Sequence, residues 1–259
     1  MLAILSPAKD MHVMPHHEHH EATRAYTEPV FLQQAGQLIE DLRKFKIDEL
    51  AVLMKMSQKL ALLNYDRFAN WRPKHTTQNS ASAMYSFAGE AYRGLDAASL
   101  SAADVAYAQQ TLRILSGLYG VIRPLDLIQP YRLEMGTRHG FWGKKNLYAF
   151  WTDTITQTII KAVEESPGEK YLVNLASNEY LKAIDVKKFK NKMVNVSFYE
   201  EKDQQLKMVT VYAKKARGMM ARFIIENRIE KLEELEAFDS DGYFFSNQHS
   251  EANHLVFVR

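Results

Sequence analysis

The feature that most limits how this chain can fold is a regular succession of helical segments and short apolar runs. Residues 147–165 carry apolar side chains at helical spacing, residues 166–168 (Ser-Pro-Gly) interrupt them, and residues 171–176 (YLVNLA) are typical of a buried strand. A helix, a turn, a buried strand and a renewed helix in that order favour a sheet that is partly parallel. We therefore expect an α/β (mixed α+β) fold, with helices flanking a mixed, partly parallel sheet.

Other segments supply the remaining elements of this expected fold. Residues 1–5 form a short apolar run that predicts a buried strand, and residues 242–245 and 255–258 predict late strands that could lie next to it. Residues 193–199 and 207–212 alternate in the β manner around a charged turn, which predicts an antiparallel hairpin. Helices are expected over residues 29–45, 48–63, 80–95, 101–116 and 214–228.

Composition excludes several kinds of protein. The 33 basic and 31 acidic residues give a net charge of +2, so a nucleic-acid surface would have to arise from local clustering of cations. The absence of cysteine excludes disulfides, thiol catalysis and thiolate metal sites. No apolar run approaches the roughly 18 residues of a membrane span, and the N-terminus lacks the pattern of a secretory signal. We expect a cytoplasmic protein without membrane contact, in which residues 1–259 form a single domain.

Residues 112–136 (LRILSGLYGVIRPLDLIQPYRLEMG) concentrate glycine, proline and arginine. Apolar residues at helical spacing lead up to Gly117, and Gly117 and Gly120 stand close enough together to indicate positive φ or a close backbone approach. A helix, a glycine turn and a further short element resemble the helix–hairpin–helix element, whose backbone amides bind DNA phosphates. The turn is one residue longer here than the usual Gly-apolar-Gly. The stretch therefore predicts a helix–hairpin–helix-like element that contacts DNA.

The same stretch contains LSGLYGVIRPLD (115–126), which closely resembles a motif of the YaaA family, bacterial proteins of the peroxide stress response. The resemblance continues through SPAK (6–9), FAGEAYRGL (87–95), LYAFW (147–151), NLASNEY (174–180), YAKKARGMMARFIIENR (212–228) and GYFF (242–245). These motifs cover nearly the whole chain in order. The resemblance implies a cytosolic DNA-binding protein that helps to keep free intracellular iron low and so limits iron-driven damage to DNA.

Basic residues from three separated motifs could form one DNA-binding surface. Lys9 follows the N-terminal strand, a group of arginines lies in the central stretch, and lysines and arginines recur along the helix at 214–228. If they converge, they form a positive cleft for duplex or distorted DNA, with salt-sensitive and weakly sequence-specific binding. The predicted DNA-contacting residues are Lys9, Gly117, Gly120, Arg123, Arg132, Arg138, Lys214, Lys215, Arg217 and Arg222. No protein partner is identifiable from the sequence.

An enzyme is the alternative hypothesis, in which a cleft lined by lysine, arginine and glutamate acts on a phosphorylated or nucleotide-like small molecule. The cations would bind the phosphate while a glutamate acts as a base, so the catalytic candidates are Lys9, Glu134 and Glu179. The full set is Lys9, Arg132, Glu134, Asn174, Ser177, Glu179, Tyr180, Lys214 and Arg217. No Walker loop, dinucleotide fingerprint or nucleophile elbow assigns a reaction, and no cofactor is expected, which favours a binding protein. Arg132 and Glu134 could equally form a structural pair.

Ser6 and Lys9 match the S-x-x-K spacing of serine acyl-enzymes. The companion motifs of those enzymes, S-D-N and K-T-G, are absent from this chain. The other interpretation is that Ser6 caps a short helix with Pro7 at its first position.

Residues 11–21 (MHVMPHHEHHE) hold five of the nine histidines. On a helix, His12, His16, His19 and His20 could share a face that suits zinc, nickel or iron. The HExxH pattern is absent because Glu21 stands where its second histidine would be, and the YaaA family normally lacks such a cluster. A solvated loop is the simpler interpretation, so no metal site is assigned, and His12, His16 and His20 stay as candidate ligands.

Overall fold

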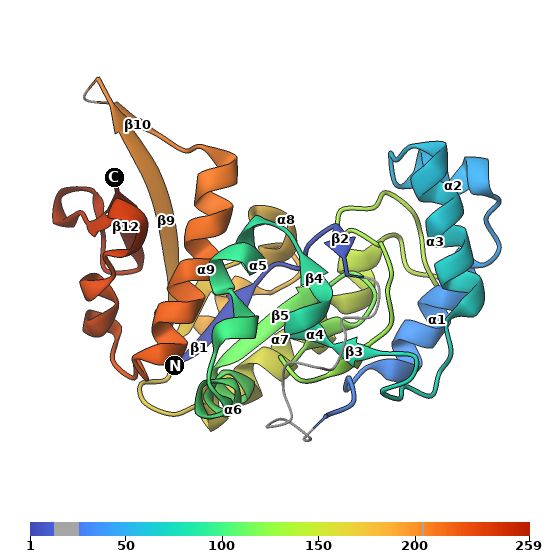
Figure 1. Ribbon diagram of the computed structural model, residues 1–259, viewed down its shortest axis with the longest axis horizontal. Coiled ribbons are helices and arrows are strands. Elements are labelled where there is room, and N and C mark those ends of the chain that lie inside the picture. The colour runs from blue at the N-terminus through green and yellow to red at the C-terminus, as the bar shows by residue number, and fades with distance from the viewer. Residues whose placement is uncertain (13–25, 204) are drawn as a thin grey trace.

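An eight-stranded mixed sheet is the centre of the computed structural model, which describes residues 1–12, 26–203 and 205–259 (Figure 1). The strand order is β11–β12–β9–β8–β1–β5–β6, and β10 pairs with β9. Neighbouring strands from β12 to β5 run parallel, whereas β6, β10 and β11 are antiparallel to their partners. The predicted α/β fold with a partly parallel sheet is therefore confirmed. The strands are β1 (Leu2–Leu5), β5 (Leu112–Ser116), β6 (Gly120–Ile122), β8 (Leu172–Leu175), β9 (Met193–Lys202), β10 (Gln205–Lys207), β11 (Phe244–Phe245) and β12 (His254–Val258).

Burial on both faces explains the apolar sequences of the inner strands. Every residue of β1 and β8 is buried, as expected for parallel strands that are covered by helices on either side. Helices α6 (Ala102–Thr111) and α9 (Thr210–Glu226) pack on one face, and α7 (Leu147–Glu165) runs behind the sheet in Figure 1. The predictions of strands at 1–5 and 171–176 and of a helix at 147–165 are confirmed. The predicted antiparallel hairpin is present, but its second strand is β10 and not residues 207–212, of which 210–212 belong to α9. The helix predicted from 214 begins earlier, at Thr210.

Helix α9 packs so closely against α5 (Glu90–Leu95) that two glycines are needed where they cross. A Cβ atom on Gly218 would lie 1.7 Å from the carbonyl oxygen of Ala91, and one on Gly94 would lie 2.1 Å from the carbonyl oxygen of Lys215. A side chain at either position would therefore push the helices apart. This glycine crossing holds the first half of α9 against α5 and so fixes where the basic side chains of α9 lie.

The helical lobe consists of α1 (Leu32–Leu42), α2 (Ile47–Leu53) and α3 (Gln58–Asn70). The helix predicted at 29–45 is confirmed, but the single helix predicted over 48–63 is wrong. Lys55 adopts a left-handed φ of +49°, and Ser57 caps a new helix by accepting the N–H of Leu60 at 3.4 Å. The apolar stripe continues across this break, so periodicity alone does not reveal it.

Residues 80–95 do not form the predicted single helix. They divide into β3 (Ala81–Ser82), α4 (Ala83–Ser86), β4 (Phe87–Ala88) and α5. The reason is long-range pairing, because β3 pairs with β7 (Leu127–Ile128) and β4 pairs with β2 (Asp10–Met11).

The late strands β11 and β12 lie at the far edge of the sheet, beside β9 and not beside β1 as expected. The remaining elements are α8 (Asn178–Leu181) and the 3-10 turns Ala97–Ser99, Val186–Phe189, Leu232–Ala237, Ser240–Gly242 and Asn247–His249.

The segment 112–122 is a β-hairpin, and the predicted helix–hairpin–helix-like element is not formed there. Helix α6 ends at Thr111, and β5 then pairs with β6 in antiparallel fashion. A strand buried on both faces has the same apolar spacing as a buried helix, which explains the wrong prediction. A Cβ on Gly117 would lie 2.1 Å from the carbonyl oxygen of Leu133, and Gly120 has a φ of +71° beneath the ring of Trp151. The two glycines therefore serve internal packing.

A polar network joins the helical lobe to this hairpin, and all four of its residues, Trp71, His75, Tyr119 and Gln129, are buried. The hydroxyl of Tyr119 accepts the Trp71 Nε1–H at 3.0 Å and the Gln129 backbone N–H at 3.2 Å. Its own proton is then directed to His75 Nε2, 3.0 Å away. Burial lowers the pKa of His75 to about 4, so the ring is neutral and can accept this proton.

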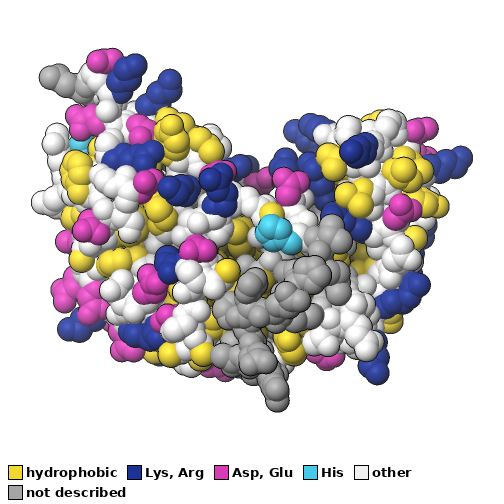
Figure 2. Space-filling view, viewed as in Figure 1, with side chains coloured by type: hydrophobic (Ala, Val, Ile, Leu, Met, Phe, Trp, Pro, Cys, Tyr) yellow, Lys and Arg dark blue, Asp and Glu magenta, His cyan; other side chains and the backbone are white. Residues whose placement is uncertain are grey.

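The molecule has the shape of a saddle. In Figure 1 the helical lobe rises on one side and α9 rises with β9 and β10 on the other, while β2, β4, α5 and α8 lie between them. Figure 2 shows the same concave face, with Lys and Arg side chains gathered on both of its walls. Within the described ranges, no helix is both long and apolar enough to cross a membrane.

Candidate functional site

A cleft opens where the connections of the sheet change direction. The adjacent parallel strands β1 and β8 lead onward to opposite sides, β1 to β5 and β8 to β9. Such a point leaves a crevice outside the carboxyl ends of the two strands, where α/β proteins bind ligands. Here a cavity of about 280 Å³ occupies that position, and residues following both strands line it. We call it the switch-point cleft.

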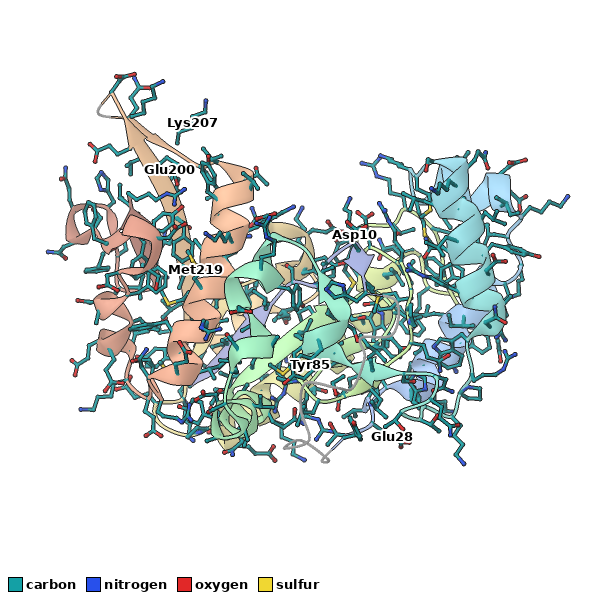
Figure 3. The ribbon with its side chains drawn as sticks, viewed as in Figure 1. Asp10, Glu28, Tyr85, Glu200, Lys207 and Met219 are labelled. Atoms are coloured by element: carbon teal, nitrogen blue, oxygen red, sulfur yellow. The ribbon has the colours of Figure 1, made fainter. Side chains whose placement is uncertain are left out.

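The switch-point cleft brings together most of the residues that the enzyme hypothesis selected. They come from the ends of β1 and β8, the loop before Gly136 and the first half of α9. Lys9, Arg132, Glu134, Ser177, Glu179, Tyr180, Lys214 and Arg217 all line it. Asn174 is the exception, because its side chain is buried below the cleft, where it donates to Asn195 and accepts the Ala176 N–H. The cleft lies under the concave face, and Figure 3 shows one of its lining residues, Asp10, between the two walls.

Glu134 stands between two cations. Its Oε2 lies 2.8 Å from Lys9 Nζ, and its Oε1 accepts from Arg132 Nη2 at 3.2 Å. The structural pairing of Arg132 with Glu134 that the sequence left open is therefore present. Both carboxylate oxygens are engaged, so Glu134 would have to release one cation before it could accept a proton from a substrate.

Glu179, the second candidate base, ties the loop to the end of β8. Its Oε1 accepts the backbone N–H of Gly136 at 2.8 Å, and its carbonyl oxygen accepts the hydroxyl of Tyr148 at 3.0 Å. The carboxylate also contributes, after burial, to the raised pKa of Tyr148 and of Tyr180. Glu179 lines the cleft, so its carboxylate could accept from a ligand hydroxyl there.

Ser6 joins the ends of β1 and β8 and does not cap a helix. Its hydroxyl oxygen accepts the backbone N–H of Ser177 at 2.9 Å and lies 3.3 Å from the Ser177 hydroxyl, while its carbonyl oxygen accepts from Tyr92 at 3.0 Å. The ammonium group of Lys9 is bound to Glu134. The S-x-x-K spacing therefore does not bring a serine nucleophile and a lysine base together in this fold.

Two guanidinium groups in the cleft have donors without acceptors. The Nε atoms of Arg132 and Arg217 are buried and make no hydrogen bond. Burial lowers the pKa of Arg217, and neither Lys214 nor Arg217 forms an ion pair with any residue in the described part of the chain. A buried donor left unsatisfied costs about 1–3 kcal/mol, so two in one cleft need an explanation. An anionic ligand would satisfy both, since guanidinium groups bind phosphate and carboxylate strongly.

Comparison with known proteins identifies the family. A family model described as peroxide stress protein YaaA matches residues 1–249. The chain belongs to the YaaA family. A UPF0246 protein of Alteromonas mediterranea is 47% identical over 259 residues, which cover 100% of this chain and 98% of that protein. The family resemblance inferred from the sequence motifs is therefore confirmed, and the family links this chain to the peroxide stress response.

Six of the ten predicted DNA-contacting residues of this YaaA-family chain do not line the cleft. Gly117 and Gly120 are buried. Arg123 pairs with Asp126 at 3.0 Å, Lys215 with Asp241 at 3.2 Å, and Arg222 with Glu226 at 2.7 Å and Asp96 at 3.5 Å; Arg138 lines a separate hollow. The cleft keeps Lys9, Arg132, Lys214 and Arg217 from the predicted set.

Sequence reasoning missed the aromatic wall of the cleft. Tyr92 and Tyr131 line it, and Phe87 packs between them with ring centroids at 5.1 Å and 6.4 Å. Burial raises the pKa of both tyrosines, which are neutral hydroxyls at physiological pH. Tyr92 belongs to the FAGEAYRGL motif of the YaaA family, so the motif itself was the signal.

Most of the histidine cluster lies outside the residues that the structure describes. His12 is described and lies beside β4 in a shallow hollow, whereas His16 and His20 lie outside the described residues. Among residues 1–12, 26–203 and 205–259, no group of three or more histidine, aspartate and glutamate side chains is arranged to hold a metal ion.

Proposed function

We propose that this YaaA-family protein binds duplex or distorted DNA on its concave face, and that it acts in the peroxide stress response to limit free intracellular iron and iron-driven DNA damage. The DNA-binding part is supported by one observation. Four cations from three distant segments meet in the switch-point cleft, and two of them present buried donors without acceptors. The iron-limiting part is carried by the family resemblance.

The walls of the concave face support the same proposal. Burial lowers the pKa of Arg67 on α3, and the negative charge of Asp10 offsets part of this effect. Because Asp10 lines the cleft, the helical lobe lies near the rim of the cleft. On the opposite wall, Figure 3 shows Lys207, the last residue of β10, on the side that leads into α9. Since the net charge of the whole chain is only +2, this local clustering is what would attract a polyanion.

The test is binding of labelled duplex, bubble and single-stranded DNA over a series of salt concentrations. We expect affinity to fall steeply with salt, with a slope of about 0.9 for each phosphate contacted. Lys214→Glu combined with Arg217→Glu should weaken binding to all sequences alike, by about tenfold per residue. Lys161→Glu is the matched control, since Lys161 is an exposed lysine on α7 outside the cleft. No binding at low salt, or an equal loss in the control, would contradict the proposal.

A second candidate function has its own supporting observation, namely that eight of the nine residues of the enzyme hypothesis line one small cleft. In this case the ligand is a phosphorylated or nucleotide-like small molecule. Thermal unfolding with inorganic phosphate and with mononucleotides would detect it, because a ligand of the folded state raises the melting temperature. Glu134→Gln would then abolish turnover while leaving DNA affinity almost unchanged. Undiminished turnover in that variant would contradict this second candidate.

A further inference from the structure

A second basic surface continues from the cleft along the loop that precedes α7. Gly136, whose N–H binds Glu179 in the cleft, also lines an adjoining open hollow of about 750 Å³. Arg138 and Lys145 line this hollow, and no carboxylate does. Arg138, Lys144 and Lys145 are exposed and form no ion pair with any residue that the structure describes. These three cations are therefore free to bind an anion.

The tip of this loop carries a tryptophan at a costly backbone position. Phe141 and Lys144 exchange backbone hydrogen bonds of 3.0 Å and 2.8 Å, and the two residues between them, Trp142 and Gly143, have φ of +47° and +73°. Two positive φ values define the pattern of a type I′ turn, in which asparagine, aspartate or glycine normally comes first. A bulky residue with positive φ is an outlier that persists where function maintains it.

The turn that carries Trp142 is fixed, and the Trp142 side chain is exposed. Its backbone N–H donates to Asp41 Oδ2 at 2.6 Å, which fixes the turn against α1. The side chain is 46% exposed, whereas the neighbouring Phe141 is fully buried against His139. The only large apolar surface exposed in this loop is thus one indole ring, set between unpaired cations. Aromatic rings beside cations form the platforms on which single-stranded nucleic acids stack their bases.

We propose that Trp142 is a stacking platform for an unpaired base, with the phosphates of the strand running along Arg138 and Lys145. This inference rests on the proposed DNA-binding function and adds a preference for bubbles and single strands over intact duplex. Trp142 itself lines a second hollow, which it shares with Lys44 and with the carboxylates of Asp41 and Glu49, and which meets the Arg138 hollow at His139 and Gly140. A polyanion would therefore be guided to the Arg138 side.

The three tryptophans of the chain allow a direct test. Trp71 and Trp151 are 3% and 0% exposed, so contact with an added strand can quench only Trp142. Titration with a short oligothymidine should quench part of the intrinsic fluorescence of the full-length protein. Trp142→Asn keeps a residue that favours the turn, and should abolish the quenching and lower bubble and single-strand affinity about tenfold. Duplex affinity should stay unchanged.

The controls separate this inference from the proposed function. Phe244→Ala removes a ring that is 56% exposed at the far edge of the sheet and should leave binding unchanged. If the wild-type protein binds duplex and bubble DNA but Trp142→Asn changes neither, the inference fails and the proposed function stands. If no DNA binds, both fail. A blue shift of Trp142 emission with phosphatidylserine vesicles, without quenching by DNA, would show instead that the loop contacts lipid surfaces.

Discussion

The polar network around Tyr119 and the switch-point cleft both bury polar groups, but they treat them in opposite ways. In the network, the Tyr119 hydroxyl accepts two hydrogen bonds and donates one to His75, so its hydrogen-bonding capacity is satisfied within the protein. In the cleft, the Nε atoms of Arg132 and Arg217 have no acceptor. Unsatisfied buried donors cost stability, so their persistence distinguishes a site that awaits a ligand from one that supports the fold.

The largest expected effect comes from opening the network. Tyr119→Phe removes the hydroxyl and leaves the Trp71 indole N–H and the Gln129 amide N–H buried without acceptors. We expect the free energy of unfolding to fall by about 4 kcal/mol, measured by urea denaturation. A loss below about 1 kcal/mol would show that water replaces the hydroxyl, and the contrast between the two regions would then break down.

The pH dependence of stability gives a second, smaller effect. The pKa of His75 is about 4 in the folded protein and 6.5 when the chain is unfolded, so the unfolded state binds more protons between these values. Stability is therefore complete above about pH 6.5 and is lost as the pH falls through this window, by about 2 kcal/mol at pH 5. His75→Gln should flatten unfolding curves measured between pH 7 and pH 5. An unchanged slope in that variant would assign the effect to other groups.

The smallest effect on stability is expected in the cleft. Arg217→Met removes a buried donor that has no acceptor and keeps the apolar part of the side chain. The free energy of unfolding should therefore rise, by no more than about 1 kcal/mol. The same variant should lose about tenfold in DNA affinity. A large destabilisation would show that Arg217 supports the fold, and the two regions would no longer differ.

The fold was predictable where burial leaves a local pattern. Strands β1 and β8 are covered on both faces, so their apolar runs predict them to within a residue or two, and α7 matches its predicted range of 147–165. Strand β5 was mistaken for a helix because Leu112, Leu115 and Leu118 fit helical spacing, while its pairing with β1 depends on a segment more than a hundred residues away. Local spacing contains no information about such a partner.

The candidate site was likewise predictable only where local sequence sufficed, because the sequence does not show which distant residues pair with its cations. The fold brings a strand end, a loop and a helix to one crevice. Lys9 follows β1, Arg132 lies in the loop before Gly136, and α9 supplies Lys214 and Arg217. Arg123, Lys215 and Arg222 look equivalent in the sequence, but each pairs with a carboxylate outside the cleft. Inside the cleft, Lys9 and Arg132 share the single carboxylate of Glu134. For Lys215 this partner is Asp241, which lies in a distant 3-10 turn. A count of cations therefore overestimates a binding surface, because neutralising partners come from elsewhere in the chain.

The glycine crossing of α5 and α9 has a consequence for the energetics of binding. Gly94 approaches the backbone of α9 at Lys215, and Gly218 approaches the backbone of α5 at Ala91, so Lys214 and Arg217 extend from a helix that is packed tightly against its neighbour. Such a frame loses little conformational entropy when an anion arrives, so most of the attraction between the charges is available as affinity. Ligand binding at this wall should accordingly show a small heat-capacity change and little reorganisation of the helix.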